Sequence, residues 1–133
     1  MKKIFLIIPF ILITFIIILF FLSQYKIALG MGDSMSPAIN NCSLLLIKEK
    51  LEPKNIQIGE IIVLNVSDIE NELLEYDVIA HRVVDNDIEN SLIATRGDNS
   101  SKYTSPEQID GYFHYDKILG KVSLYIKAPD MIC

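Results

Sequence analysis

The chain divides into one uninterrupted apolar segment and a longer region in which short apolar runs alternate with polar breaks. Residues 4–22 carry no charge and are mostly Ile, Leu and Phe. As a helix rising about 1.5 Å per residue, they would reach roughly 28 Å, close to the thickness of a hydrocarbon core. Lys2 and Lys3 precede them, so the positive-inside rule places the N-terminus in the cytoplasm. The pattern predicts a membrane-spanning helix that is followed by an extracytoplasmic region.

A cleaved secretory signal peptide is the competing interpretation of this segment. Ala28 and Gly30 flank Leu29 as a small-x-small cleavage site. However, the apolar run exceeds the roughly 7 to 15 residues of such a peptide, and Lys26 interrupts the approach to the site. We therefore assign residues 1–24 to a cytoplasmic tip and transmembrane anchor, and residues 25–133 to one extracytoplasmic domain at the cell membrane.

The remainder of the chain has the periodicity of β-strands. Short apolar or alternating runs are separated by Gly, Pro, Asn and Asp, which end strands and form turns. Residues 85–87 are expected at a hairpin tip. The predicted strands cover 43–48, 59–66, 77–84, 91–95 and 119–126. We expect a mainly β fold, in which a single transmembrane helix precedes a compact β-rich domain.

Composition narrows the classes of partner. Lys and Arg number 12 against 17 Asp and Glu, for a formal net charge of −5, which disfavours nucleic acid as a partner. Cys42 and Cys133 could pair in an oxidising compartment, but a single pair does not decide this. The sequence contains no cofactor motif and no cluster with metal-ligand spacing, so we expect neither a cofactor nor a metal.

The chemically informative motif is the turn around Ser34, in the run Gly-Asp-Ser-Met-Ser-Pro that begins at Gly32. A serine hydroxyl attacks a carbonyl only when a neighbouring base takes its proton. The chain has two histidines, His81 in an apolar strand and His114 in a polar and aromatic stretch. Successive strand residues point to opposite faces, so His81 and its neighbour Arg82 are not both buried in one core.

A third candidate follows in the run Thr-Arg-Gly-Asp-Asn, which contains Asp98. Gly-Asp-Asn is ordinary turn chemistry, and this interpretation stays open. A carboxylate at the end of a strand can also hold a histidine base in its productive tautomer, as in serine hydrolase triads. The candidate catalytic set is therefore Ser34, His81 and Asp98.

Together these motifs resemble type I signal peptidase. The serine motif beyond an N-terminal apolar segment, the run Ile-Ala-His-Arg-Val-Val from Ile79 and the Asp98 motif carry the likeness, and residues 60–64 and 119–122 resemble framework strands. Self-cleaving repressors share the serine motif and the catalytic fold. The resemblance implies a signal-peptidase-like and repressor-like β domain that acts as a serine endopeptidase.

One position indicates the branch of the family. Bacterial-type members carry a lysine base directly before the arginine of the second motif, whereas this chain has His81 before Arg82. This is similar to the ER type, which also occurs in archaea and endospore-forming bacteria. The resemblance implies Ser34 as nucleophile, His81 as general base and Asp98 as orienting acid. Because a base must be neutral to accept a proton, we expect activity to fall in acid.

Two positions depart from the pattern of the family. Where ER-type members have a second aspartate about six residues after the first, this chain has Thr104. Where some members have a serine two residues before the nucleophile, this chain has Gly32, so the oxyanion would depend on backbone N–H groups around Ser34. Met35 is a candidate wall of the substrate pocket or a residue of the core.

The implied function is removal of signal peptides from exported preproteins after small-x-small sites. Expected partners are these preproteins and the lipid bilayer, and the protein-translocation machinery is a further candidate. Two alternatives remain open: a non-catalytic anchored β domain that serves as an interaction module, and a secreted soluble hydrolase released after Gly30.

Overall fold

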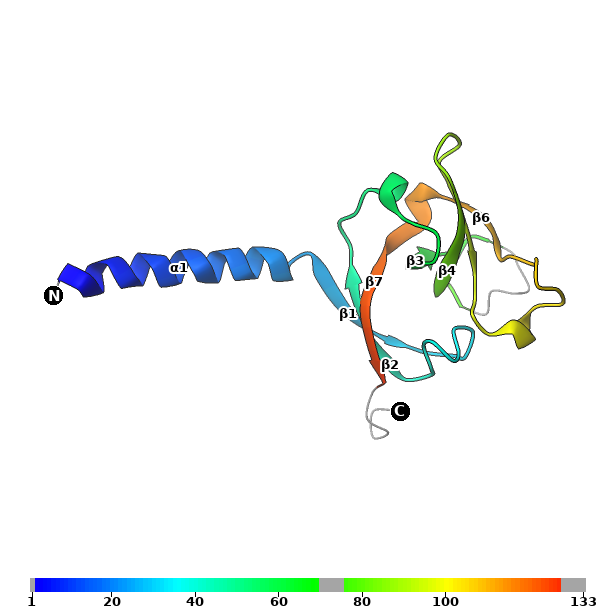
Figure 1. The fold of residues 1–133 in the computed structure, drawn as a ribbon, viewed down its shortest axis with the longest axis horizontal. Helices are drawn as coiled ribbons and strands as arrows, with labels where there is room; N and C mark the ends of the chain where they lie inside the picture. Colours follow the sequence, from blue (N-terminus) through cyan, green and yellow to red (C-terminus); the bar gives the residue numbers. More distant parts are fainter. Residues whose placement is uncertain (1, 70–75, 128–133) are drawn as a thin grey trace.

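The computed structural model describes residues 2–69 and 76–127, and for residues 2–7 it describes the backbone only. Helix α1 (Lys2–Leu22) extends away from a β domain, which holds all the strands (Figure 1). Among the described residues, three short 3₁₀ helices lie in the loops, η1 (Pro53–Asn55), η2 (Ser100–Lys102) and η3 (Tyr115–Lys117). The strands are β1 (Tyr25–Gly30), β2 (Ser43–Lys48), β3 (Ile61–Asn65), β4 (Val78–Asp87), β5 (Leu92–Arg96), β6 (Gly111–His114) and β7 (Ile118–Lys127).

The strands form one seven-stranded antiparallel sheet in the order β1-β2-β7-β3-β4-β5-β6. The prediction of a mainly β chain agrees with this sheet, whereas β1 and β6 were not predicted. The expected hairpin tip at 85–87 lies inside β4, and the turn between β4 and β5 begins after Asp87. Strand β7 crosses the middle of the sheet and pairs with both β2 and β3, so it joins the two halves.

The predicted membrane-spanning helix is corrected by the structure. Among the residues that it describes, no helix is long and apolar enough to cross a membrane. The predicted boundary between residues 24 and 25 lies at the start of β1.

Two clusters of buried apolar side chains stabilise the domain. Alternation along the strands places every second side chain inside, as in β2, where Leu45 and Ile47 are buried and their neighbours are partly exposed. One cluster lies under β3, β4, β5 and β6 and includes Ile62, Leu64, Val83, Ile93 and Phe113. The other supports the turn that carries the serine motif and includes Met35, Ile39, Leu45, Ile47, Ile61 and Val63.

The outer face of β1, β2 and β7 is apolar and exposed to solvent. The antiparallel register aligns the side chains on this face in two rows that run across the strands. The first row contains Ile27, Leu46 and Leu124, and the second contains Leu29, Leu44 and Ile126.

The sequence left open whether Cys42 and Cys133 pair. In the structure Cys42 is disulfide-bonded, while Cys133 lies outside the described residues.

Candidate active site

Ser34 lies in the turn between β1 and β2, at the rim of a cleft. The turn begins at Gly32, whose positive φ of 88° is a conformation that favours glycine. The Gly32 N–H donates to Asn41 Oδ1 at 3.0 Å, and the Ser36 N–H donates to Asp33 O at 2.9 Å. These bonds hold the turn in shape from both sides of Ser34, which remains partly exposed.

His81 meets Ser34 from the neighbouring part of the sheet. It is only 3% exposed, and its Nε2 lies 2.9 Å from Ser34 Oγ, although 47 positions separate the two residues. Strand β4 pairs with β3 so that His81 lies opposite Ile62, and this pairing fixes the position of the imidazole on the inner face. The structure therefore brings together the two residues predicted as nucleophile and base.

The acid that contacts His81 is Asp110. Its Oδ2 lies 2.6 Å from His81 Nδ1, and both side chains are buried. The same oxygen accepts a hydrogen bond from Thr95 Oγ1 at 2.8 Å, and Oδ1 accepts from the Tyr103 hydroxyl at 2.7 Å. A carboxylate accepts but does not donate, so the proton of His81 belongs on Nδ1, and Nε2 is left to accept from the Ser34 O–H.

Asp98, the predicted orienting acid, has a different partner. Its carboxylate forms a bidentate ion pair with Arg82, with Oδ1 2.8 Å from Nε and Oδ2 2.5 Å from Nη2. This hydrogen bond raises the pKa of the Arg82 guanidinium above its usual value. Arg82 follows His81 in β4 and points to the other face, so its partner does not approach the imidazole. The prediction that Asp98 orients His81 is corrected to Asp110.

The loop that contains Asp98 nevertheless supports the nucleophile. The Asn99 N–H donates to Ser34 O at 2.8 Å, and Asn99 Nδ2 donates to Asp33 O at 3.1 Å. Gly97 packs so closely that a Cβ atom there would lie 2.5 Å from Ser34 O. The Lys102 ammonium lies 3.3 Å from an Asp33 carboxylate oxygen. This loop therefore fixes the backbone on which Ser34 is mounted.

Gly32 and Met35, the predicted oxyanion and pocket residues, have distinct positions. The N–H of Gly32 already bonds to Asn41, whereas in the described part of the chain no acceptor meets the N–H of Ser34. The Ser34 N–H is therefore the backbone donor available beside the nucleophile. Met35 is buried in the core cluster below the turn and also lines the cleft, so both of its anticipated roles coincide.

The cleft beside Ser34 is mostly apolar and has a volume of about 700 Å³. Its walls come from β1, including Ala28, from Met31 directly after β1, and from the start of β4, including Ile79. Residues 78–81 pair with β3 on one side only, because the β4 pairing with β5 begins at Arg82. Strand β1 is likewise an edge strand. Two unpaired backbone edges therefore face the cleft, and each can bond an extended peptide.

A smaller cavity of about 30 Å³ lies directly at Ser34 and His81. Gly32, Ile79 and Tyr76 also line it. A space of this size holds about one water molecule or one methyl group. It would accept the side chain of a small residue and exclude a large one.

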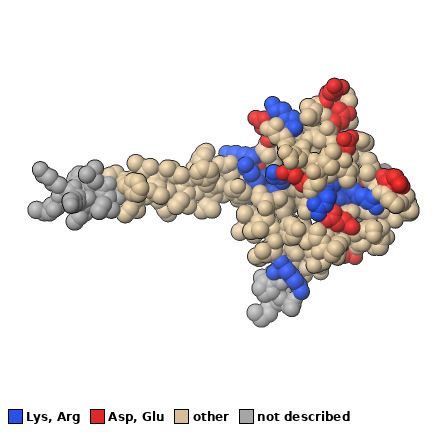
Figure 2. Space-filling model, in the orientation of Figure 1, with Lys and Arg blue, Asp and Glu red and all other residues tan. Residues whose placement is uncertain are grey.

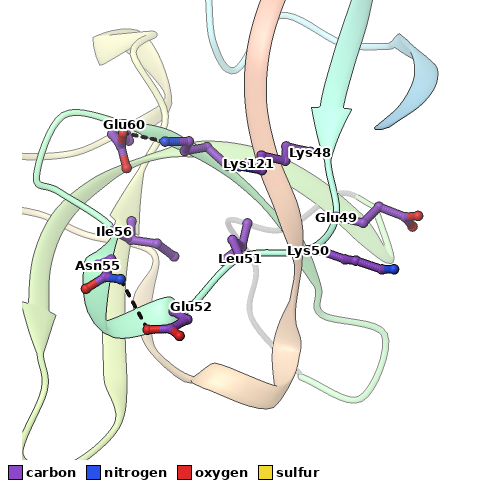
Figure 3. Close-up of a pocket in the computed structure, with 9 residues that line it drawn as sticks. All are labelled: Lys48, Glu49, Lys50, Leu51, Glu52, Asn55, Ile56, Glu60 and Lys121. Carbon is purple, nitrogen blue, oxygen red and sulfur yellow. Dashed lines mark hydrogen bonds and ion pairs between the residues drawn. The ribbon is translucent and has the colours of Figure 1, made fainter. Parts of the chain in front are cut away.

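A second large cavity, of about 640 Å³, lies elsewhere, beside η1 and the ends of β2 and β7 (Figure 3). One ion pair and one further hydrogen bond join side chains of its lining. Lys121 Nζ bonds to Glu60 Oε1 at 2.7 Å, and Asn55 Nδ2 bonds to Glu52 Oε2 at 3.2 Å. Leu51 extends into the space between these pairs in Figure 3. Neither Ser34 nor His81 lines this second cavity, so we assign it no chemistry.

Within residues 2–69 and 76–127, no group of three or more His, Cys, Asp or Glu side chains is arranged to hold a metal ion. His114, the other histidine, is exposed at the end of β6, directly before η3, and is not part of the Ser34 cluster.

Sequence reasoning missed Asp110 because it placed the second acid by a fixed spacing. That spacing leads to Thr104, which bonds to Gln108 within the loop. A usable signal was present, since Asp110 directly precedes the short apolar run that forms β6. Strand β6 pairs with β5, which contains Thr95, so an acid directly before β6 is held close to β5.

Searches of protein-family models, curated proteins and solved structures found no match to this chain. The candidate function therefore depends on the sequence motifs and on the geometry described above.

Proposed function

We propose that this protein is a serine endopeptidase of the signal peptidase I type, ER branch, which removes signal peptides from exported preproteins. The observation that carries the proposal is the hydrogen-bonded series from Ser34 Oγ to His81 Nε2, at 2.9 Å, and from His81 Nδ1 to Asp110 Oδ2, at 2.6 Å. These are the contacts that a serine nucleophile needs from its base and that the base needs from its orienting acid.

The reaction is acyl transfer to Ser34. As Oγ attacks the carbonyl carbon of the scissile peptide, its proton moves to His81 Nε2. Asp110 accepts the hydrogen bond from Nδ1 and stabilises the imidazolium that forms. His81 then gives the proton to the leaving amine, and the carbon–nitrogen bond breaks. In the second half, His81 takes a proton from water as its oxygen attacks the ester carbon, the bond from that carbon to Ser34 Oγ breaks, and His81 returns the proton to Oγ.

The tetrahedral anion needs donors near the nucleophile. The Ser34 N–H has no acceptor among the described residues and lies in a turn whose shape is set by Gly32. A backbone donor of this kind stabilises the charge that develops on the carbonyl oxygen. The Asn99 bond to Ser34 O holds the following peptide unit in place.

The cleft supports a peptide substrate with small residues before the cut. An extended segment between β1 and the start of β4 would bond to both edges, with alternate side chains directed into the apolar cleft. The cavity of about 30 Å³ at Ser34 fits Ala, Gly or Ser as the residue whose carbonyl is attacked. This agrees with the small-x-small pattern of signal peptides.

We further propose that the domain works at a lipid bilayer on the extracytoplasmic side, where the translocation machinery delivers preproteins. The described side chains of α1 are exposed and, apart from Thr14, apolar, with Phe10 exposed by 73%, and the helix shows no charged atoms in Figure 2 outside the grey residues. The two apolar rows on the outer face of β1, β2 and β7 add exposed apolar surface next to it. Large exposed apolar surfaces mark membrane or protein contact sites, and flotation of the purified chain with liposomes would test lipid binding.

The direct test of the peptidase is cleavage of a preprotein with a small-x-small site by the purified full chain in detergent. We expect one cut, directly after the second small residue, and none with Ser34→Ala. A matched substrate with Leu in place of that small residue should remain uncut, because the cavity at Ser34 excludes it.

The alternative is a non-catalytic interaction module that binds peptides at the free strand edges. If the folded wild type fails to cut several such preproteins, yet wild type and Ser34→Ala bind them equally, the peptidase proposal is refuted and the module is supported. If Ser34→Ala binds the preprotein as the wild type does and only the wild type cuts it, a non-catalytic interaction module does not explain the result, and the peptidase proposal is supported.

A further inference from the structure

We infer that Tyr103 is a positioning residue that links the orienting acid to the backbone of the nucleophile, so that Ser34, His81 and Asp110 are held as one closed ring of contacts. This inference rests on the proposed peptidase function. Neither the serine motif nor the histidine motif assigns a role to a tyrosine in this loop.

The hydroxyl of Tyr103 makes two hydrogen bonds of opposite sense. It donates to Asp110 Oδ1 at 2.7 Å and accepts from the Gly97 N–H at 2.5 Å. Because Asp110 Oδ2 serves His81, the tyrosine holds the other oxygen and fixes the rotation of the carboxylate. Hydrogen bonds in such a series polarise and strengthen one another.

The ring closes through Gly97. A Cβ atom at Gly97 would lie 2.5 Å from Ser34 O and 3.0 Å from the Tyr103 hydroxyl, so its backbone is packed against both. A displacement of Asp110 would therefore be transmitted through Tyr103 and Gly97 to the peptide unit of Ser34. The positions of Asp110 and of the Ser34 backbone are therefore coupled.

The tyrosine ring is itself held in place. The Arg96 guanidinium carbon lies 4.4 Å from the ring centroid, a cation–π contact, and Arg96 Nη2 donates to Ser105 O at 3.3 Å. Burial, followed by the hydrogen bond to Asp110, raises the pKa of Tyr103 well above its usual value. The hydroxyl therefore keeps its proton and donates at every pH at which a histidine base works.

The test is Tyr103→Phe, which removes the hydroxyl and leaves the ring on Arg96. Tyr112→Phe is a matched control, because the Tyr112 hydroxyl also donates to an aspartate, Asp85, at 2.9 Å, but at an exposed position outside the cleft. We expect Tyr103→Phe to lower kcat about tenfold or more with KM little changed, as for one hydrogen bond to a charged group. Tyr112→Phe should match the wild type.

The pH profile separates positioning from a general structural effect. With one donor fewer, the Asp110 carboxylate is a stronger acceptor and stabilises protonated His81 more. The acid limb of kcat/KM should therefore move to higher pH in Tyr103→Phe. An unchanged kcat and an unmoved acid limb would overturn the inference.

A second measurement is independent of peptidase activity. NMR of the ¹⁵N-labelled histidine ring reports the Nδ1–H bond to Asp110, and His81→Gln assigns the signal. We expect the resonance and its titration to shift in Tyr103→Phe and to stay in place in Tyr112→Phe. If the wild type cuts no preprotein but this shift occurs, the peptidase proposal fails while the Tyr103 linkage stands. If the resonance does not move, the linkage is refuted whatever the activity.

Discussion

The carboxylate of Asp110 lies 2.6 Å from the Nδ1 atom of His81, and both side chains are buried below the cleft. Because Asp110 holds Nδ1, the other ring nitrogen, Nε2, is the one that meets Ser34. Because the remaining Asp110 oxygen is also bonded, to Tyr103, the acid has a single defined orientation.

Asp110→Asn should abolish most of the activity while the chain remains folded. An amide can donate to Nδ1, which favours the tautomer with the proton on Nε2, and that nitrogen then no longer accepts from Ser34. We expect kcat to fall by about 10²–10⁴-fold, in the range known for the equivalent change in serine protease triads. Steady-state cleavage of the preprotein, with circular dichroism for folding, measures both quantities.

Asp98→Asn is the matched comparison, because the same change is made at the acid that pairs with Arg82. The pair is partly exposed, so its loss should cost about 1 kcal/mol of the free energy of unfolding. Activity should fall by much less than with Asp110→Asn, since Asp98 does not contact His81. Urea denaturation and the same cleavage assay test this. A larger loss of activity at Asp98 than at Asp110 would contradict the assignment of the acid.

Gly97→Ala should impair both folding and activity. The added Cβ would lie 2.5 Å from Ser34 O, so the backbone must shift, at a cost of about 1–3 kcal/mol in the free energy of unfolding. Gly59→Ala is the control: no atom lies within 4 Å of its Cβ, but its φ is +93°, so it also destabilises, by about 1 kcal/mol. Only Gly97→Ala should reduce cleavage by folded protein, because only this glycine packs on Ser34.

The raised pKa of Tyr103 predicts that the free energy of unfolding decreases at alkaline pH. Burial and the bond to Asp110 raise the pKa of Tyr103 in the folded state above that of the unfolded chain, so the folded state binds the proton more tightly. This contribution is fully present below about pH 10, the ordinary tyrosine value, and is lost as the pH rises toward the folded-state pKa. We expect the free energy of unfolding to decrease above about pH 10 and the decrease to be smaller in Tyr103→Phe.

Urea unfolding of wild type, Tyr103→Phe and Tyr112→Phe across this range measures the effect. The hydrogen bond to Asp85 also raises the pKa of Tyr112, but at an exposed position where solvent screens the interaction. Its variant should keep nearly the wild-type dependence on pH. Equal slopes in wild type and Tyr103→Phe would show that the tyrosine is not held as described.

Much of the sheet could be predicted from local patterns. The five predicted strands correspond to β2, β3, β4, β5 and β7. Strand β2 alternates between buried and partly exposed side chains, whereas β3 and β5 are short apolar runs that are buried almost throughout. Strand β1 was missed because its Tyr25 and Lys26 lie at the exposed edge of the sheet, where the pattern is weak. Strand β6 was missed because Gly111 and His114 surround only two apolar residues.

The membrane-spanning helix was the largest correction to the predicted fold. Apolar composition over residues 4–22 was sufficient to predict it. Within the described residues, no helix has the length and apolar character needed.

The sequence by itself determined the residue types and the strand that carry the site, with Ser34 in a glycine turn and His81 on a strand next to Arg82. Only the tertiary structure decided which acid reaches His81. The pairing of Thr95 with Gly111, together with the Asp110 N–H bond to Thr95 O at 2.9 Å, places Asp110 next to the imidazole. Asp98 follows Arg96, which pairs with Arg82, and is directed to the guanidinium on the opposite face. Spacing along the chain does not specify this choice, because the length of the loop after β5 and the register of β6 set which carboxylate the sheet brings to the histidine.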